Sequence, residues 1–249
     1  MLRINFALAL YVAAVDGYIK DNTCESSILI ANFSMLQTQD AKTMFLFPTP
    51  VILHDLEGSD YLNVDLLKRI RAKREEDEGL KRSNYGGWHS EVDMTVWCED
   101  MARIILGEAI NQTTKQTVDV HPHGKRDFAF DAQMWANISG PNHSNQMHCH
   151  PGALWSGVYY VDVGEDDSDT DVEGELLLMD PRFPMNVMYM PELVNRYADG
   201  KPQYAQVPIR PVNGRMVLFP AWLNHSVRPY KGKRERVSIA FNLMTHPVD

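Results

Sequence analysis

The stretch Ser156-Gly-Val-Tyr-Tyr-Val161 is one of several short apolar segments that fill the second half of the chain and decide its fold. Each segment has the length of a strand and is bounded by polar turns. The strands predicted in this half are residues 128–138, 154–163, 175–179, 207–209, 215–219 and 236–243. Many short strands with regular turns are typical of a β-sandwich or a β-barrel. We therefore expect a mostly β fold, with helices from the first half flanking one sheet.

The first half of the chain predicts one edge strand and two helices. Residues 44–53 form an apolar stretch interrupted by two prolines, which are tolerated only at the edge of a sheet. Asn63 is expected to cap a helix that ends near Gly79. A second helix is predicted over residues 94–115, where apolar residues recur at helical spacing. Residues 81–90 are rich in turn formers and are expected to form a loop.

Composition limits the partners that this chain can have. Its 249 residues carry a net charge of −9 at pH 7, which argues against a nucleic-acid-binding surface, because phosphate binding needs concentrated Lys and Arg. Three cysteines, Cys24, Cys98 and Cys149, are odd in number and far apart. They predict no disulfide framework, which fits a cytoplasmic protein. The apolar run at residues 6–15 is too short to span a bilayer, so no membrane partner is expected.

Domain organisation follows from the distribution of these patterns. Residues 44–249 contain all of the predicted strands and helices and no interdomain linker, which indicates a single domain. Residues 1–43 are predicted to be an N-terminal extension whose role the sequence does not assign.

His148-Cys149-His150 is the pattern that most directly indicates chemistry. Residues two apart on an extended strand point to the same face, so His148 and His150 are expected to hold one metal ion while Cys149 points away. Such pairs also occur on ordinary surfaces, and a metal site therefore needs a further ligand. His225 is the candidate, because the apolar segment at residues 214–219 would deliver it from a distant strand.

Arg236 and Ser238 provide a second pattern downstream of His225. They lie in a predicted strand, where alternate residues share one face. A guanidinium fork with a neighbouring hydroxyl is well suited to clamp a carboxylate. Metal ligands together with a carboxylate clamp indicate a metal enzyme that uses an acidic cosubstrate.

Taken in order, these motifs resemble the Fe(II)- and 2-oxoglutarate-dependent oxygenases. The motifs are His148-x-His150, Ser156-Gly-Val-Tyr-Tyr160, Asp180-Pro-Arg182, His225 and Arg236-x-Ser238. Within that superfamily the chain looks most like a bacterial and phage subfamily that has the Ser-Gly-Val-Tyr-Tyr strand and the Asp-Pro-Arg turn. The resemblance covers residues 44–242 and implies a double-stranded β-helix, which is a cupin-like jelly roll.

The same resemblance implies roles for individual residues. His148 and His225 would be Fe(II) ligands, Arg236 would bind the distal carboxylate of 2-oxoglutarate, and Ser238 would assist Arg236. The activity implied is that of a dioxygenase, an oxidoreductase that hydroxylates an unidentified substrate and releases succinate and CO2.

Position 150 departs from the superfamily, which has an acidic residue there to complete a set of two histidines and one carboxylate. Either His150 is the third ligand or another side chain such as Asp180 takes that place, and strand geometry favours His150. Asn137, Tyr160 and Asp180 are also expected around the pocket. His89, in contrast, is expected to be an ordinary loop or surface residue.

Two other hypotheses stay open at this point. A three-histidine cupin-type metal dioxygenase or isomerase that does not use 2-oxoglutarate would have the same ligands, but Arg236 and Ser238 would then hold a different carboxylate. A non-catalytic jelly-roll binding module with a structural metal is the other alternative. The sequence does not specify whether the substrate is a small molecule or a peptidyl group, and it is compatible with a homo-oligomer.

Overall fold

The computed structural model describes residues 42–165, 172–188 and 190–248. By internal contacts the chain divides into Met1–Leu46 and Phe47–Asp249, and the fold described below is that of the second unit. The predicted extension at residues 1–43 falls almost entirely outside the described residues and stays a prediction. Within the described ranges, every helix is too short or too polar to cross a bilayer.

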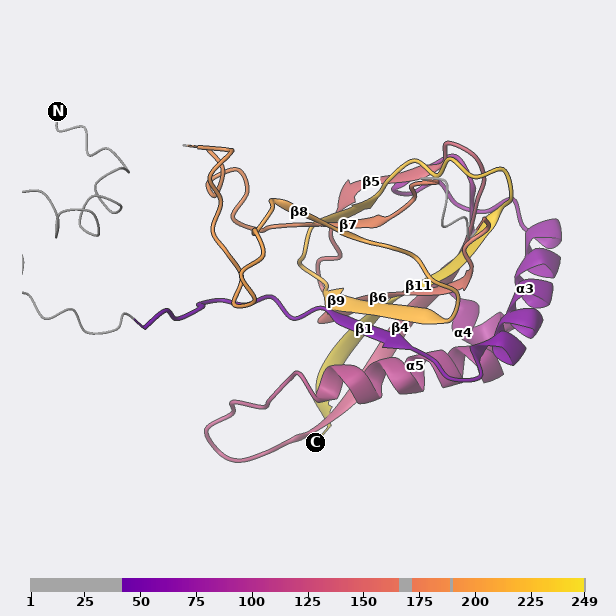
Figure 1. Ribbon diagram of the computed structural model, residues 1–249. Coiled ribbons are helices and arrows are strands. Elements are labelled where there is room, and N and C mark those ends of the chain that lie inside the picture. Colours follow the sequence, from indigo (N-terminus) through magenta and orange to yellow (C-terminus); the bar gives the residue numbers. More distant parts are fainter. Residues whose placement is uncertain (1–41, 166–171, 189, 249) are drawn as a thin grey trace, which may run out of the picture. The chain divides into compact units, whose positions relative to one another are not determined.

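Two antiparallel sheets carry the fold (Figure 1), which confirms the expected mostly β, jelly-roll architecture. The major sheet has the order β1 (Ile52–Asp55), β9 (Arg215–Pro220), β6 (Trp155–Asp162), β11 (Arg236–Val248), β4 (Asp127–Ser139) and β3 (Trp88–His89). The minor sheet has the order β2 (Asn84–Tyr85), β5 (Ser144–His148), β10 (His225–Val227), β7 (Leu176–Met179) and β8 (Gln206–Ile209).

Three helices pack against one face of the major sheet. They are α3 (Ser59–Glu76), α4 (Met94–Trp97) and α5 (Glu99–Thr114). Leu66 and Ile70 of α3 and Ile105 of α5 are fully buried in a core that they share with sheet residues such as Met216 and Ile239. The helices therefore seal one face of the major sheet and leave the opposite face for the site.

Strand β11 divides its side chains between that core and a cavity. The residues on the helix side are Val237, Ile239, Phe241 and Leu243. The alternate residues, which line the cavity, are Arg236, Ser238, Ala240 and Asn242. Because side chains of a strand alternate between faces, one continuous segment supplies both the core and the site.

The Ser-Gly-Val-Tyr-Tyr segment of β6 has a packing role on the helix side. The Tyr159 hydroxyl donates a hydrogen bond to Asn63 Oδ1 of α3 at 2.7 Å, which fixes the helix on the sheet. A Cβ at Gly157 would lie 2.7 Å from Leu218 Cδ2 and closer still to the Phe241 ring. The glycine is therefore needed because neighbouring core side chains occupy the space above it.

The helices differ from the predictions in their boundaries. Helix α3 begins after Gly58, and Asn63 lies buried inside it, so Asn63 is not the cap. Its amide is accommodated there because it accepts the tyrosine hydrogen bond. The second predicted helix is broken at Cys98 into α4 and α5. Val96 of α4 and Ile104 of α5, which were expected on the apolar face, are exposed, at 77% and 56%.

The first strand is an edge strand, as the prolines predict, but it is shorter than expected. Strand β1 begins at Ile52, after both prolines, and pairs only with β9. Proline has no backbone N–H to donate to a neighbouring strand, so residues before Ile52 do not join the sheet. The predicted loop at residues 81–90 contains the two short strands β2 and β3.

Candidate active site

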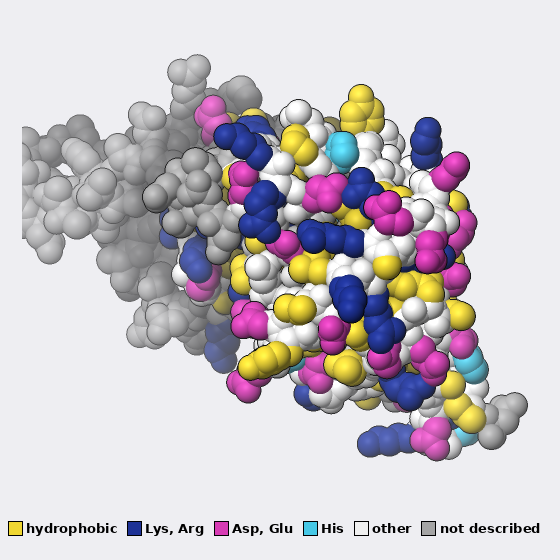
Figure 2. Space-filling view, turned by 90° about the vertical axis from the view of Figure 1, so that its right-hand side faces the viewer, with side chains coloured by type: hydrophobic (Ala, Val, Ile, Leu, Met, Phe, Trp, Pro, Cys, Tyr) yellow, Lys and Arg dark blue, Asp and Glu magenta, His cyan; other side chains and the backbone are white. Residues whose placement is uncertain are grey.

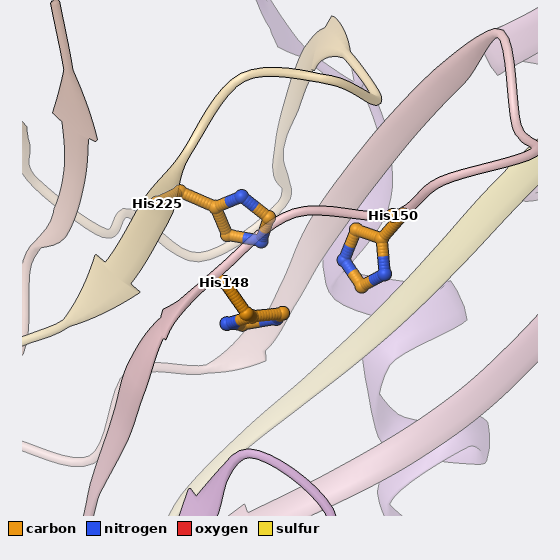
Figure 3. Close-up of side chains that lie close together, drawn as sticks. All are labelled: His148, His150 and His225. Atoms are coloured by element: carbon orange, nitrogen blue, oxygen red, sulfur yellow. The ribbon is translucent and has the colours of Figure 1, made fainter. Parts of the chain in front are cut away.

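Three histidines converge between the two sheets. One ring nitrogen from each of His148, His150 and His225 lies within 4.8 Å of the others. Figure 3 shows the three rings turned toward a common point. His148 ends β5 and His225 begins β10, and the two are register partners of adjacent strands. Strand pairing therefore places two of the three rings side by side, although 225 and 148 are far apart in sequence.

His150 reaches the cluster by a route that the sequence interpretation had wrong. Strand β5 ends at His148, so His150 is not on a shared strand face. Its backbone N–H donates to the Ala221 carbonyl at 2.8 Å, in the segment that leads to His225. His150 therefore lies just beyond the end of β5, and this hydrogen bond to Ala221 holds it beside the other two histidines.

Backbone carbonyls orient two of the rings. His148 Nδ1 lies 2.7 Å from the Gln146 carbonyl, and His225 Nδ1 lies 2.9 Å from the Leu223 carbonyl. A carbonyl can only accept, so each Nδ1 carries the proton and each Nε2 keeps a free lone pair. This is the arrangement in which an outer partner fixes the tautomer of a metal-ligating histidine.

Burial favours the neutral form of two of the three histidines. Desolvation, with a smaller contribution from His148, lowers the pKa of His225 to about 3. The same causes lower the pKa of His150 to about 4. Both imidazoles are therefore neutral at pH 7, and neutral imidazole is a good ligand for divalent iron. The residues present fit a transition-metal ion.

Asp180 lies outside this cluster. Its carboxylate accepts hydrogen bonds from Arg182 at 2.7 and 2.9 Å and from Asn186 Nδ2 at 2.9 Å. The Arg182 guanidinium holds the pKa of Asp180 below its usual value. In the described part of the chain, Asp180 belongs neither to the possible metal-binding group nor to the lining of the cavity. Asp180 and Arg182 instead form an ion pair that anchors a turn after β7.

The histidines open into a cavity of about 560 Å³ between the two sheets. Its floor is the face of β4, β11 and β6 that points away from the helices. Asn137, Ser238 and Tyr160 form one row across these three strands and all line the cavity. Burial raises the pKa of Tyr160 to about 12, so its phenol stays protonated. Asn137 and Tyr160 therefore line the cavity, and a part for them in binding stays a prediction.

Arg236 is a buried cation that forms no ion pair with any acidic residue in the described part of the chain. Its side chain is only 4% exposed, and its Nη1 donates to the Gly174 carbonyl. The guanidinium carbon lies 5.7 Å from the centre of the Tyr230 ring. Nε is buried and has no hydrogen-bond partner among the described residues. Burial lowers the pKa of Arg236, and the opposing effects of Tyr160, Tyr230 and Glu175 are smaller.

Such a guanidinium fits an anionic ligand. A buried charge is costly unless it is paired, and a carboxylate would supply both the charge and the missing acceptor. Ser238, 8% exposed, lies one cavity-facing position further along β11 and can add a hydroxyl to the same ligand. The structure therefore brings the predicted clamp into the same cavity as the histidines.

Three residues of this region escaped the sequence interpretation. Gly174 has φ +82°, and a Cβ there would lie 2.6 Å from Arg236 Nη1, so only glycine allows the guanidinium to approach. Ser83 Oγ lies 3.4 Å from His148 Nε2. His89 is 4% exposed, lines the cavity and stacks on Trp135 at 5.4 Å, which corrects its assignment as an ordinary loop residue. The sequence signal near His89 is the pair of glycines at 86 and 87, which indicated a turn but not the burial of the histidine.

Comparison with protein families gives one match. Residues 133–242 match a family described as "Putative 2OG-Fe(II) oxygenase". This segment runs from β4 to β11 and contains the three histidines, Arg236 and Ser238. No curated protein matches the chain.

Several solved structures resemble the fold. A prolyl hydroxylase from Trichoplax adhaerens, in complex with a hypoxia inducible factor peptide, is 13% identical, with 78% of this chain and 83% of that chain covered and a TM-score of 0.51. HygX from Streptomyces hygroscopicus, with nickel and 2-oxoglutarate bound, is 11% identical, with 79% and 83% covered and a TM-score of 0.51. The epimerase SnoN from nogalamycin biosynthesis is 11% identical, with 79% and 78% covered and a TM-score of 0.51. At these identities the likeness shows the fold.

Proposed function

We propose that this chain is a 2OG-Fe(II) oxygenase that hydroxylates its substrate with His148, His150 and His225 as the iron ligands. The family match over residues 133–242 and the cluster of three histidines support this proposal. Arg236 and Ser238 are proposed to hold the distal carboxylate of 2-oxoglutarate. The overall reaction converts a substrate C–H group, 2-oxoglutarate and O2 into an alcohol, succinate and CO2.

The observation that carries this proposal is that a buried guanidinium, whose Nε has no hydrogen-bond partner among the described residues, shares one cavity with three clustered imidazoles. When bound, Fe(II) with 2-oxoglutarate supplies the oxidising chemistry that places one atom of O2 on the substrate and the other in succinate. The part of this chain is to bind and orient. His148 and His225 present Nε2 because backbone carbonyls hold their Nδ1 protons. Arg236 and Ser238 position the cosubstrate, and the two sheets limit access of water.

Calorimetric titration with 2-oxoglutarate under nitrogen tests this proposal without a substrate. We expect saturable binding that requires Fe(II). Arg236→Met, which keeps the apolar stem, is expected to weaken binding by about 30-fold or more, because a cosubstrate carboxylate loses its charged partner. Binding that is independent of metal, or unchanged in Arg236→Met, would favour the three-histidine enzyme that does not use 2-oxoglutarate.

Turnover provides the second arm of the test. Succinate is expected to form from 2-oxoglutarate only when both iron and O2 are supplied, at a slow rate in the absence of substrate. His225→Ala should abolish this succinate. His121→Ala is the matched control, because His121 is exposed and outside the cluster. Metal binding without any consumption of O2 would support a non-catalytic binding module.

We also propose that the protein works in the cytoplasm on a small-molecule or peptidyl substrate and has no nucleic-acid or membrane partner. The cysteine pattern and the net charge of −9 support these assignments. Of the described cysteines, Cys98 and Cys149 are both free thiols. Cell fractionation with an antibody against the protein tests the location, and recovery in a membrane or secreted fraction contradicts it.

A further inference from the structure

The cavity is lined by a second arginine in addition to the one that is proposed to bind 2-oxoglutarate. Apart from histidines, its charged lining residues are Arg82 and Arg236, and none of the described lining residues is Asp, Glu or Lys. The outer surface differs, since basic and acidic side chains are interspersed on the face shown in Figure 2. In a chain of net charge −9, a cavity with two arginines and no carboxylate is selective for anions.

The Arg82 guanidinium is free to bind a ligand. Many other arginines are paired: Arg69 with Asp100, Arg74 with Glu235, Arg126 with Asp119 and Arg215 with Asp55. Arg82 is exposed, and no hydrogen bond or ion pair joins its guanidinium to any described residue. Its charge is therefore uncompensated at the mouth of the cavity.

Hydrogen bonds hold the Arg82 segment beside the histidines. The Arg82 backbone N–H donates to Asn84 Oδ1 at 2.7 Å. The next carbonyl, that of Ser83, accepts from the Gln146 N–H of β5 at 2.9 Å, and the Ser83 hydroxyl lies 3.4 Å from His148 Nε2. The backbone at Arg82 is therefore held beside the strand that ends in His148.

The two arginines lie on opposite sides of the cluster. The minor sheet has β2 next to β5, then β10, then β7. Arg82 precedes β2, His148 is on β5, His225 is on β10, and Gly174, the acceptor of Arg236, precedes β7. At about 4.8 Å per strand, β2 and β7 are about 14 Å apart. A five-carbon 2-oxoglutarate held by Arg236 is too short to span this distance, so Arg82 is available for a second ligand.

We propose that Arg82 binds the carboxylate of a small substrate, so that the substrate and 2-oxoglutarate approach the histidine cluster from opposite sides. This inference rests on the proposed function and adds the chemical class of its substrate. The cavity of about 560 Å³ is within the size range of small-ligand sites.

Saturation-transfer NMR on the full chain tests the class of substrate. The protein is loaded with Zn²⁺ in place of iron and saturated with 2-oxoglutarate, so that no turnover occurs and the Arg236 subsite is filled. The probes are small carboxylates, each paired with its own carboxamide: benzoate with benzamide, phenylacetate with phenylacetamide, and N-acetylglycine with its amide. We expect the carboxylates to bind about tenfold more tightly than the amides.

Variants that change the charge at one position show which residue causes the preference for carboxylates over amides. Arg82→Gln is expected to remove it, and Arg82→Lys to retain part of it, because a point charge survives without the planar fork. Arg71→Gln makes the same change of charge at an exposed position on α3, outside the cavity, and should keep the full preference. Absence of any carboxylate preference, or a preference that persists in Arg82→Gln, overturns the proposal.

Failure of this inference can be told apart from failure of the proposed function. The wild-type protein is titrated with 2-oxoglutarate before the probes are added. Binding of 2-oxoglutarate without a carboxylate preference contradicts the role of Arg82 alone. Absence of 2-oxoglutarate binding contradicts the proposed function, and a carboxylate preference lost in Arg82→Gln then still supports an anion site at the mouth.

Discussion

His150 stands where the oxygenase superfamily has a carboxylate, and the difference is one of charge. An imidazole donates a lone pair but cancels none of the charge of the metal. The acidic candidate, Asp180, is paired with Arg182 and Asn186 and lies outside the cluster. The third ligand of this site is therefore expected to be neutral.

The affinity for a metal ion distinguishes His150 from Asp180 as the third ligand. His150→Ala is expected to weaken Zn²⁺ binding more than about 100-fold, because loss of an outer partner alone costs about 10- to 100-fold. Asp180→Asn should leave the affinity unchanged, since it removes only a turn ion pair. Competition with a chromogenic chelator measures both. The reverse pattern, a large loss in Asp180→Asn and none in His150→Ala, contradicts the three-histidine site.

Gly174 controls the position of Arg236. In Gly174→Ala, the new Cβ would meet Nη1 at 2.6 Å with φ at +82°, so the guanidinium must move. We expect about tenfold weaker 2-oxoglutarate binding and unchanged Zn²⁺ affinity, measured by calorimetry and chelator competition. Gly152→Ala is the control, because Gly152 also has a positive φ of 92° but open space around its Cβ position. Equal effects in both variants would attribute the loss to backbone strain alone.

Much of the site can be predicted from single residues, because their chemistry is specific. Three histidines and the Arg236–Ser238 pair are recognisable by type and spacing. Gly174 and Ser83 are not, because their importance comes from distances to residues far away in sequence. Burial of His89 is equally invisible, since it depends on β3 pairing with β4 and on stacking against Trp135.

Strand β6 shows how one segment serves two layers. Gly157 faces the helix-side core, where Phe241 and Leu218 fill the space that a side chain would need. Gly157→Ala is expected to lower the free energy of unfolding by about 1–3 kcal/mol, because it overpacks that core. Gly107→Ala, in an exposed turn of α5 with open space around it, should instead raise stability by about 0.5–1 kcal/mol.

Urea denaturation monitored by circular dichroism measures both variants. The opposite signs make the pair informative, because a general effect of adding a methyl group would move both in one direction. A stable Gly157→Ala variant would mean that the core of β6 and β11 can open without cost.

The segments were predicted well where local pattern decides them and less well at their ends. All six strands expected in the second half are present, since alternation and turns are local signals. The start of α3 was misplaced at Asn63 because its hydrogen bond to Tyr159 is a tertiary contact. The sequence also did not predict the break at Cys98, because the segments on both sides of it have helical periodicity.

At the scale of the whole molecule, a metal ion at the histidine cluster would link segments that are far apart in the chain. His148 and His225 belong to adjacent strands of the minor sheet, and His150 is tied to the segment between β9 and β10. A metal held by all three therefore joins segments that are distant in sequence. Metal binding is expected to raise the free energy of unfolding by about 2.7 kcal/mol at a free metal concentration 100 times the Kd.

Differential scanning calorimetry with Zn²⁺ and with a chelator measures this stabilisation. The wild-type Tm should rise with metal concentration, and His225→Ala should show no such dependence. A Tm that is equal with metal and with chelator would mean that the histidines do not bind the ion in the folded state.

The alternation of side chains along β11 makes the protein intolerant of a change in strand register. Val237, Ile239 and Phe241 pack under the helices, whereas Arg236 and Ser238 face the cavity. Deleting one residue early in this strand would turn each later side chain to the opposite face of the sheet. Polar cavity residues would then be buried under the helices, and apolar core residues such as Ile239 would face the cavity. Mutation can therefore change β11 by substitution but not by insertion or deletion, and its length is constrained even where its composition is not.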